Sequence, residues 1–353
     1  MKILLCNERF LFRFGVDRVL LLLGFYWKKA GHEIIMMGNK LDKLVADKCS
    51  DRFIQIPQAA DYLHANDFTR NYLKEHWDEW FTTEDRPDLA FIAGWPFYRS
   101  IAFLREKCGY AVFQDHGAVP MDGMSASEKV IQKELRRLRK ENLKQADQVI
   151  AVSRFIEDSQ SIPDTEKSIP TDYVYNGVDH MDINIWEKDA LDMDGNDVIS
   201  DIRSLKKQGY RLIFQPGRWE AGNYKNSDAG FDIAKRIRKN GFKFKILVLC
   251  QKQDMKKIPH EVADCFYCMG NIDDFTMQTV MKYSDLGFST SLWEGFDLPL
   301  GEMQFLNKHM YVFQAGAHAE VVADSFFCCQ TNEEMSDKIC QDLAGKIKIS
   351  ESV

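Results

Sequence analysis

Two carboxylates, Glu294 and Glu302, lie eight positions apart in a segment where a buried strand is expected to turn into a helix. The strand is predicted to end at Thr290, Gly295 lets the loop turn, and Pro299 suits the first turn of the helix. A helix N-terminus offers unpaired N–H groups and a favourable dipole to phosphate. Ionised carboxylates accept hydrogen bonds from hydroxyl groups, such as those of a sugar or a ribose. The segment therefore predicts a site for hydroxyl groups next to phosphate.

A second cluster consists of Gly217, Arg218 and Lys225, which follow a predicted strand ending at Phe214 and Gln215. Two cations at one strand end could neutralise a diphosphate leaving group. The alternative is an arginine and a lysine in ordinary surface loops, and for these residues alone that interpretation would be preferred. Beside the two glutamates, we favour a role in binding a diphosphate.

Two smaller signals lie in the first half of the chain. His116 follows the predicted strand Ala111–Asp115 and precedes Gly117, so it is expected at a strand end, where it could contact a ligand. It could equally be satisfied by local backbone groups, and Asp115 is interpreted as structural. Gly15 lies in the turn that enters the first long helix.

In their order along the chain, these motifs resemble the family-4 retaining glycosyltransferases of GT-B fold, whose signature is E-x7-E within E-G-F-G-L-P-x-x-E. The resemblance implies that Glu294 holds the donor sugar and that Glu302 holds the ribose hydroxyls of the nucleotide. Asp297 stands where the family usually has glycine, so its side chain would point toward the donor sugar or the diphosphate. The implied donor-binding residues of this segment are Gly295, Phe296, Asp297, Leu298 and Glu302.

The other signals take their roles from the same resemblance. Arg218 and Lys225 would stabilise the diphosphate, and Gly217 would form the turn before them. His116 would reach the donor sugar across a cleft. Gly15 would be what remains of a Gly-Gly pair whose backbone lies close to the diphosphate.

The resemblance also implies an activity of the hexosyltransferase type with retention of configuration. The donor would be a nucleotide diphosphate sugar, and the acceptor a glycan or a lipid-linked molecule in polysaccharide or glycolipid biosynthesis. In a front-face reaction the leaving phosphate oxygen takes the acceptor proton, so neither a cofactor nor a metal ion is expected. Three alternatives stay open: a GT-B sugar-nucleotide epimerase or phosphorylase, an NAD-linked oxidoreductase, and a non-catalytic protein that binds nucleotide sugars. The oxidoreductase lacks its G-x-G-x-x-G fingerprint here.

Short apolar runs alternate with helix-period stretches along most of the chain, which is typical of parallel α/β units. The pattern stops near Asn176 and resumes at Arg211, with an acidic stretch between them. We therefore expect an acceptor-side domain over 1–178, a connection over 179–206 and a donor domain over 207–353. The fold class expected is α/β of GT-B type, with two Rossmann-like parallel-sheet domains facing a central cleft. The predicted strands are Lys2–Cys6, Glu33–Met37, Phe53–Ile56, Leu89–Ala93, Ala111–Asp115, Gln148–Val152, Asp172–Tyr175, Arg211–Gln215, Phe244–Leu249, Cys265–Met269, Leu286–Thr290 and Met310–Phe313.

Composition and charge set limits on partners and location. The 353 residues carry a formal charge of −7, which gives no reason to expect nucleic acid as a partner. The longest early apolar run, Val19–Trp27, is too short to span a bilayer. Cys265 and Cys268 form a lone C-x-x-C without a second pair, so buried thiols are favoured over a zinc site. A cytoplasmic protein is expected, with a peripheral contact at the inner membrane face left open.

That membrane contact depends on a basic helix over 128–144. Its positive face could rest on anionic lipid, or it could simply be solvated, which is slightly preferred. An aromatic loop at Phe10, Phe12 and Phe14 could likewise contact an acceptor or a membrane, or serve only as packing. The aromatic stretch around Trp77 is expected in a helix core.

Overall fold

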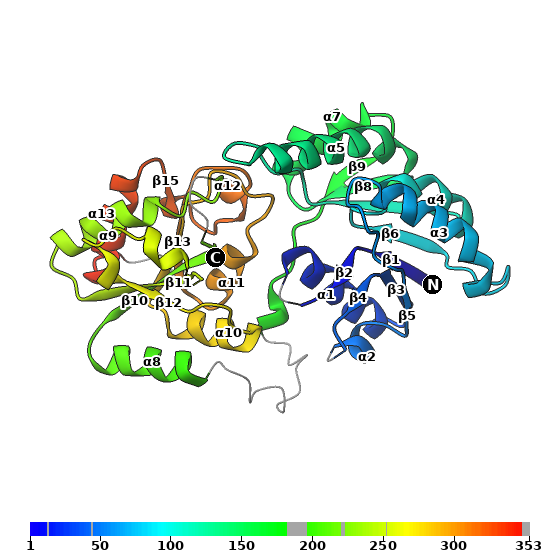
Figure 1. Ribbon diagram of the computed structural model, residues 1–353. Coiled ribbons are helices and arrows are strands. Elements are labelled where there is room, and N and C mark those ends of the chain that lie inside the picture. The colour runs from blue at the N-terminus through cyan, green and yellow to red at the C-terminus, as the bar shows by residue number, and fades with distance from the viewer. Residues whose placement is uncertain (13, 44, 182–195, 220–222, 252, 348–353) are drawn as a thin grey trace. The chain divides into compact units, whose positions relative to one another are not determined.

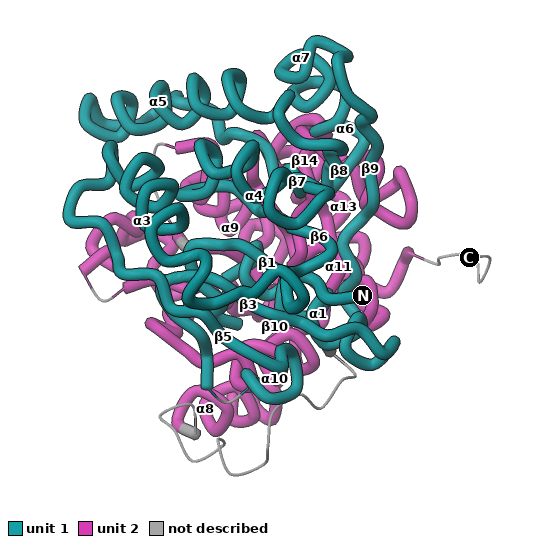
Figure 2. Tube along the Cα trace, turned by 90° about the vertical axis from the view of Figure 1, so that its right-hand side faces the viewer, with its two compact units in different colours: residues 1–180, 184–187 teal, residues 181–183, 188–353 magenta. Residues whose placement is uncertain are grey.

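The computed structural model describes residues 1–347 except 13, 44, 182–195, 220–222 and 252. The described chain divides into two compact units, which Figure 2 shows in different colours. Unit 1 contains Met1–His180, and unit 2 contains the described residues from Asn196 onward. Each unit is built around its own parallel sheet with helices packed against it (Figure 1).

The sheet of unit 1 has seven strands in the order β5-β3-β1-β6-β7-β8-β9, and every neighbouring pair is parallel. All seven were predicted from apolar runs, with ends within two residues of those observed. The runs are readable because a parallel sheet covered on both faces buries successive side chains. The strands are β1 (Lys2–Cys6), β3 (Glu33–Gly38), β5 (Arg52–Gln55), β6 (Leu89–Ile92), β7 (Ala111–Asp115), β8 (Gln148–Ala151) and β9 (Thr171–Tyr173), and a separate pair is formed by β2 (Arg9–Phe10) and β4 (Lys40–Leu41).

The helices of unit 1 bury their apolar faces on this sheet. Trp77 and Phe81 are 3% exposed and belong to the core, which confirms the interpretation of that aromatic stretch. Phe10 and Phe12 are also fully buried, so the packing alternative holds for these two rings. The helices are α1 (Gly15–Lys29), α2 (Ala46–Cys49), α3 (Ala65–Trp80), α4 (Ile101–Cys108), α5 (Ala126–Asn142), α6 (Arg154–Ile156) and α7 (Ile162–Thr165).

The sheet of unit 2 has six parallel strands in the order β12-β11-β10-β13-β14-β15. Five of them were predicted. The sixth, β15, is only two residues long, and so short a run carries no periodicity that could be read from sequence. The strands are β10 (Arg211–Arg218), β11 (Phe244–Leu249), β12 (Phe266–Cys268), β13 (Leu286–Ser289), β14 (His309–Phe313) and β15 (Cys328–Cys329).

Alternate residues of these strands face two separate apolar clusters, as the period of a strand requires. Ile213 and Tyr311 pack in the cluster of α9 and α13, whereas Phe214 and Val312 pack in the cluster of α8, α10 and α11. Helices therefore cover both faces of the sheet. Their bounds are α8 (Asn196–Lys207), α9 (Ala229–Lys239), α10 (Asp274–Tyr283), α11 (Leu298–Phe305), α12 (His318–Val321) and α13 (Asn332–Leu343).

The connection expected over 179–206 differs from the structure in its second half. Residues 182–195 lie outside the described residues, but α8 is a regular helix with Ile202 only 1% exposed. Ile202 packs with Val198 and Leu205 in a core cluster of unit 2. The acidic composition of the segment concealed this apolar face, and unit 2 therefore begins before the expected boundary at residue 207. None of the helices in the described part of the chain has the length and hydropathy needed to cross a bilayer.

Candidate functional site

The predicted site residues of unit 2 lie where three adjacent strands end. β10, β13 and β14 are neighbours in the sheet, and all three are parallel. Lys225 and Glu294 lie in the loops that follow β10 and β13, and His318 is the first residue of α12, which follows β14. Because ligands of open parallel sheets bind beyond the carboxyl ends of the strands, this edge is the expected binding edge.

Lys225 and Glu294 form an ion pair at this edge, with 2.7 Å between Nζ and Oε1. Backbone contacts hold the two loops together, because Leu292 N donates to Tyr224 O at 2.7 Å and Thr290 Oγ1 donates to Lys225 O. The Glu294 side chain is 12% exposed and that of Lys225 is 27% exposed. The sequence predicted a cation after β10 and a carboxylate after β13, and the structure places these two side chains in contact.

Burial acts differently on the two partners. Burial raises the pKa of Glu294, and the positive charge of Lys225 opposes this rise. Burial also disfavours the ammonium of Lys225, but its acidic neighbours, Glu294 foremost and Asp297 among the others, together outweigh burial and raise the pKa of Lys225. Lys225 is therefore a cation at neutral pH. A partly exposed ammonium beside a shielded carboxylate can bind a phosphate oxygen while the carboxylate accepts from hydroxyl groups.

Asp297 precedes α11 in a left-handed conformation, with φ of 69°. Its Oδ1 accepts from Leu300 N at 3.4 Å, and its Oδ2 lies 2.8 Å from Nε2 of His318. His318 is completely buried, and its other nitrogen, Nδ1, lies 2.8 Å from Phe313 O. Burial disfavours the charge of Asp297, but the hydrogen bond and charge of His318 lower its pKa below the usual value.

The cap made by Asp297 changes the expected role of the α11 N-terminus. Unpaired N–H groups, open to phosphate, were expected there from the sequence. Instead, Leu300 N already donates to the Asp297 carboxylate and also to Asp297 O, at 3.1 Å. With glycine at position 297, the hydrogen bond from Leu300 N to the side-chain carboxylate would be absent. The negative charge at this helix end thus comes from the chain itself.

The loop after β14 packs against the backbone of Glu294. Ala317 N donates to Glu294 O at 3.0 Å. Gly316 has φ of +56°, and a Cβ at this position would come within 2.6 Å of Glu294 N and closer still to its carbonyl oxygen. Only glycine fits this close approach. Gly316 and His318 lie in a segment, 316–322, that also matches the resembled family, but neither was predicted as a site residue.

The remaining predicted residues of unit 2 are placed as follows. Glu302 lies in the second turn of α11 and is 2% exposed, so only a small part of its surface is accessible. Gly217 has φ of +87° at an irregularity near the end of β10, where the register with β11 shifts between Gln215 and Arg218. Arg218 is the last residue of β10, and its side chain lies outside what the structure describes. The other residues of the Glu294 loop are Gly295, the buried Phe296 and, at the start of α11, Leu298.

In unit 1, His116 lies directly after β7 at the carboxyl edge of the sheet, as predicted. Burial lowers its pKa to about 4, so the imidazole is neutral at pH 7, and its Nε2 lies 3.2 Å from Gln114 Oε1. The turn is held by Asp115, which is buried, pairs with Arg139 and accepts from Gly117 N at 2.8 Å. This agrees with the structural role expected for Asp115.

Gly15 is the first residue of α1, as predicted. Two residues later, the buried Asp17 accepts from Asn7 Nδ2, Arg9 Nε and Leu11 N, each at 3.1 Å. These bonds tie the loop after β1 to the first turn of α1. Burial raises the pKa of Asp17 to about 6, so this carboxyl takes up a proton near that pH.

Among the described residues, Glu294, Asp297 and His318 are close enough to hold a metal ion, with their ligand atoms within 4.8 Å of one another. The chemistry of the donor set does not favour one. The ammonium of Lys225 already donates to Glu294, and Nε2 of His318 already faces Asp297. Lys225 and His318 thus already contact the two carboxylates, and a metal ion would have to displace both contacts.

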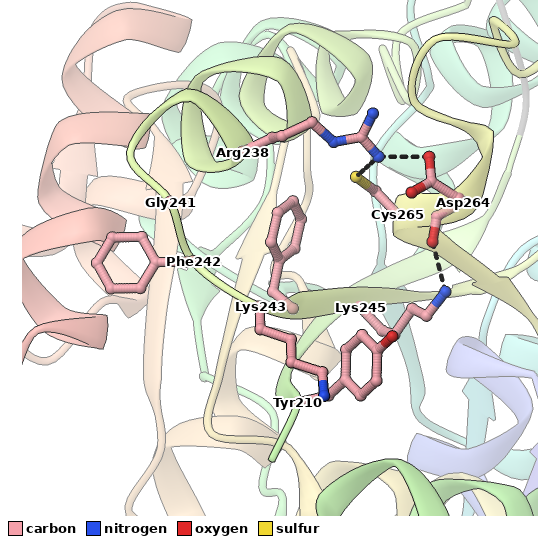
Figure 3. A pocket seen from close by; sticks show the side chains of 9 residues that line it. Tyr210, Arg238, Gly241, Phe242, Lys243, Lys245, Asp264 and Cys265 are labelled. Atoms are coloured by element: carbon pink, nitrogen blue, oxygen red, sulfur yellow. Dashed lines mark hydrogen bonds and ion pairs between the residues drawn. The ribbon is translucent and has the colours of Figure 1, made fainter. Parts of the chain in front are cut away.

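A cavity of about 360 Å³ lies at the amino ends of β10 and β11, the edge opposite to this site (Figure 3). Its cations hold backbone carbonyls: Lys243 donates to Gln208 O at 2.6 Å, Lys245 to Asp264 O, and Arg238 to Glu261 O and the Asp264 carboxylate. The basic residues of this cavity therefore stabilise the neighbouring loops. None of the predicted site residues lines the cavity.

Solved structures with the same architecture cover both units. The structure superposes on a sucrose-phosphate synthase from Thermosynechococcus elongatus with a TM-score of 0.69 at 14% identity, covering 98% of this chain and 90% of that chain. For WaaG, a glycosyltransferase involved in lipopolysaccharide biosynthesis, the TM-score is 0.66 at 13% identity, covering 97% of this chain and 90% of that chain. For HepE from Anabaena, in complex with UDP-glucose, the TM-score is 0.65 at 14% identity, covering 98% of this chain and 91% of that chain. The fold of the chain is therefore GT-B, as predicted.

The family model described as Glycosyltransferase Family 4 matches residues 15–181, which is most of unit 1. Residues 15–181 are therefore similar to Glycosyltransferase Family 4, and the described chain has the GT-B fold. A comparison with curated proteins returned no match.

Proposed function

We propose that the chain is a retaining glycosyltransferase that moves a sugar from a nucleotide diphosphate donor to a glycan or a lipid-linked acceptor. The observation that carries this proposal is the Lys225–Glu294 pair at the carboxyl edge of unit 2. It places a fixed positive charge beside a hydroxyl-binding carboxylate, which is what a sugar diphosphate requires. That HepE was solved with UDP-glucose supports a donor of this class.

In the proposed reaction, the acceptor oxygen bonds to the anomeric carbon while the bond from that carbon to the leaving phosphate oxygen breaks. The departing phosphate oxygen takes the acceptor proton on the same face, which retains configuration. Lys225 and Arg218 stabilise the negative charge that develops on the diphosphate. Glu294 holds sugar hydroxyls, Glu302 holds the ribose, and neutral His116 can donate to or accept from a sugar hydroxyl. Because the chain supplies the positive charge, we propose that no metal ion takes part.

The test is a panel of UDP-, GDP- and ADP-sugars, incubated with the protein with and without EDTA and followed by proton NMR. We expect donor cleavage with one nucleotide class, an α-configured product from an α-configured donor, and the same rate after EDTA treatment. A product of inverted configuration, or activity that EDTA abolishes and Mg²⁺ restores, would contradict the respective part of the proposal. An altered nucleotide sugar with no released nucleotide would identify an epimerase, and a dependence on phosphate would identify a phosphorylase.

We further propose a peripheral contact with anionic membranes through α5. Lys129, Lys133 and Lys140 are exposed on this helix, and Val130 between them is 55% exposed. Three exposed lysines and an exposed apolar side chain suit a lipid surface of negative charge. Two of the negative charges of the helix are neutralised within it, because Arg137 pairs with both Glu134 and Glu141.

The expected result is co-sedimentation with vesicles that contain anionic phosphatidylglycerol, and weaker binding at high salt. Reversing Lys129 and Lys133 to glutamate should lower this binding about tenfold or more. The control reverses two exposed lysines elsewhere, Lys74 and Lys282. Equal losses in both variants would mean that net charge, rather than α5, governs the contact.

A further inference from the structure

We propose that His318 is a positioning residue for the donor site: as a buried imidazolium paired with Asp297, it fixes the loop that carries Glu294. The inference rests on the proposed function and adds to it the part of the chain that holds the donor-binding carboxylate in place. The pair involves a departure from the resembled pattern, since Asp297 stands where the family usually has glycine.

The hydrogen bonds of His318 determine its charge. Nδ1 lies 2.8 Å from Phe313 O and Nε2 lies 2.8 Å from Asp297 Oδ2. A carbonyl and a carboxylate both accept, so each ring nitrogen must donate. A neutral imidazole has one N–H and would leave one of these short contacts between two acceptors. With the side chain 0% exposed, water cannot take over either role.

Asp297 depends on this partner for its conformation. A left-handed backbone is unfavourable for a residue with a side chain, and it persists only where surrounding contacts hold it. Two contacts hold it here: Leu300 N on Oδ1 and His318 on Oδ2. The carboxylate is 5% exposed, so without the imidazolium it would be a buried charge with one backbone amide as its hydrogen-bond donor and only the more distant charge of Lys225 to oppose burial.

The segment from Gly316 to His318 contacts both ends of the donor-binding loop. At one end, Gly316 and Ala317 N meet the backbone of Glu294; at the other, the His318 ring meets Asp297. The three loop residues from Glu294 to Phe296 therefore lie between two fixed points. If the contact between His318 and Asp297 is lost, the backbone of Glu294 keeps its hydrogen bond from Ala317 N, but the turn at Asp297 is no longer fixed. The distance between the Glu294 carboxylate and Lys225 is then no longer set.

The charged groups that face His318 are Asp297 and, farther away, Glu294, and Lys225 lies on the other side of these carboxylates. Burial of His318 opposes its charge, but the hydrogen bond and charge of Asp297 outweigh burial and raise the pKa of His318 above its ordinary value of 6.5. The stabilisation from this pair is therefore fully present below pH 6.5 and is lost as the pH rises through the raised pKa of the folded protein. Donor affinity should fall over the same interval.

The experiment measures donor affinity by calorimetry at several pH values for the wild type, His318→Gln and His309→Gln. His309 is a matched control, because it pairs with Asp342 in the same unit, with 2.6 Å between Nδ1 and Oδ2, at the start of β14 and away from the site. We expect His318→Gln to weaken donor binding about tenfold at pH 6.5 and to remove the loss at higher pH, while His309→Gln leaves both unchanged. Equal affinity of His318→Gln and wild type would overturn the inference.

A second measurement needs neither activity nor a variant of His318 that folds well. An NMR titration of the histidine C–H resonances, with that of His318 assigned, should show that His318 is still protonated above pH 6.5, and Asp297→Asn should move its pKa below 6.5. A neutral His318 at pH 6 would overturn the inference even if donor binding is strong. If no nucleotide sugar binds the wild type while the titration gives the expected result, the proposed function fails and the ion pair stands.

Discussion

Lys225→Ala should lower kcat/KM for the nucleotide-sugar donor about 100- to 1000-fold, the range found when one preorganised donor of charge stabilisation is removed from an active site. The variant loses the cation that is proposed to stabilise the leaving diphosphate. It also leaves Glu294 buried without its counter-charge, so the pKa of Glu294 should rise further. Steady-state kinetics with the best donor of the panel is the measurement.

Lys225→Arg keeps the charge and should recover part of the activity. The control for loss of a lysine elsewhere is Lys243→Ala, since Lys243 donates to a backbone carbonyl at the opposite edge of the sheet. It should change kcat/KM by less than about twofold. Should Lys225→Ala turn over donor at the wild-type rate with its melting temperature unchanged, Lys225 has no part in the chemistry.

Gly316→Ala should lower the free energy of unfolding by about 3 kcal/mol, because overpacking and backbone strain add at this position. The new Cβ would lie 2.6 Å from Glu294 N, and φ at residue 316 is +56°. The neighbour is backbone, which cannot rotate away as a side chain can. The Glu294 loop must move instead, so donor binding should be lost together with stability. Thermal unfolding and donor calorimetry measure the two effects.

Gly209→Ala separates strain from overlap. Gly209 has φ of +81°, also in the left-handed region, but nothing lies within 4 Å of the point that a Cβ would occupy there. It should therefore lose only about 1 kcal/mol and keep full donor affinity. Similar losses in both variants would show that close packing against Glu294 is not what requires glycine at 316.

Much of the fold could be predicted because parallel strands buried on both faces read as apolar runs. This worked for β1, β7 and β11, whose observed bounds match the prediction residue for residue. It failed for β15, which is too short, and for α8, because the Asp-rich stretch in which it begins reads as a linker. In both cases tertiary packing, which no local pattern records, determines the structure.

The site was predictable in its parts but not in its connections. The resemblance singled out Lys225 and Glu294, which are 69 residues apart, but only the structure pairs them. His318 lies 21 residues from Asp297, and nothing in either local sequence indicates that they meet. The aspartate was noticed as a departure at a glycine position. Its physical consequence, a capped helix end and a buried counter-ion, follows only from the three-dimensional contacts.

The central claim is that the carboxyl edge of unit 2 binds a nucleotide sugar, and a crystal structure with the best donor of the panel tests it most directly. We expect a diphosphate oxygen at about 3 Å from Lys225 Nζ, sugar hydroxyls on Glu294 and ribose hydroxyls on Glu302. A donor bound at any other place in the chain, with neither Lys225 nor Glu302 in contact with it, would contradict the claim.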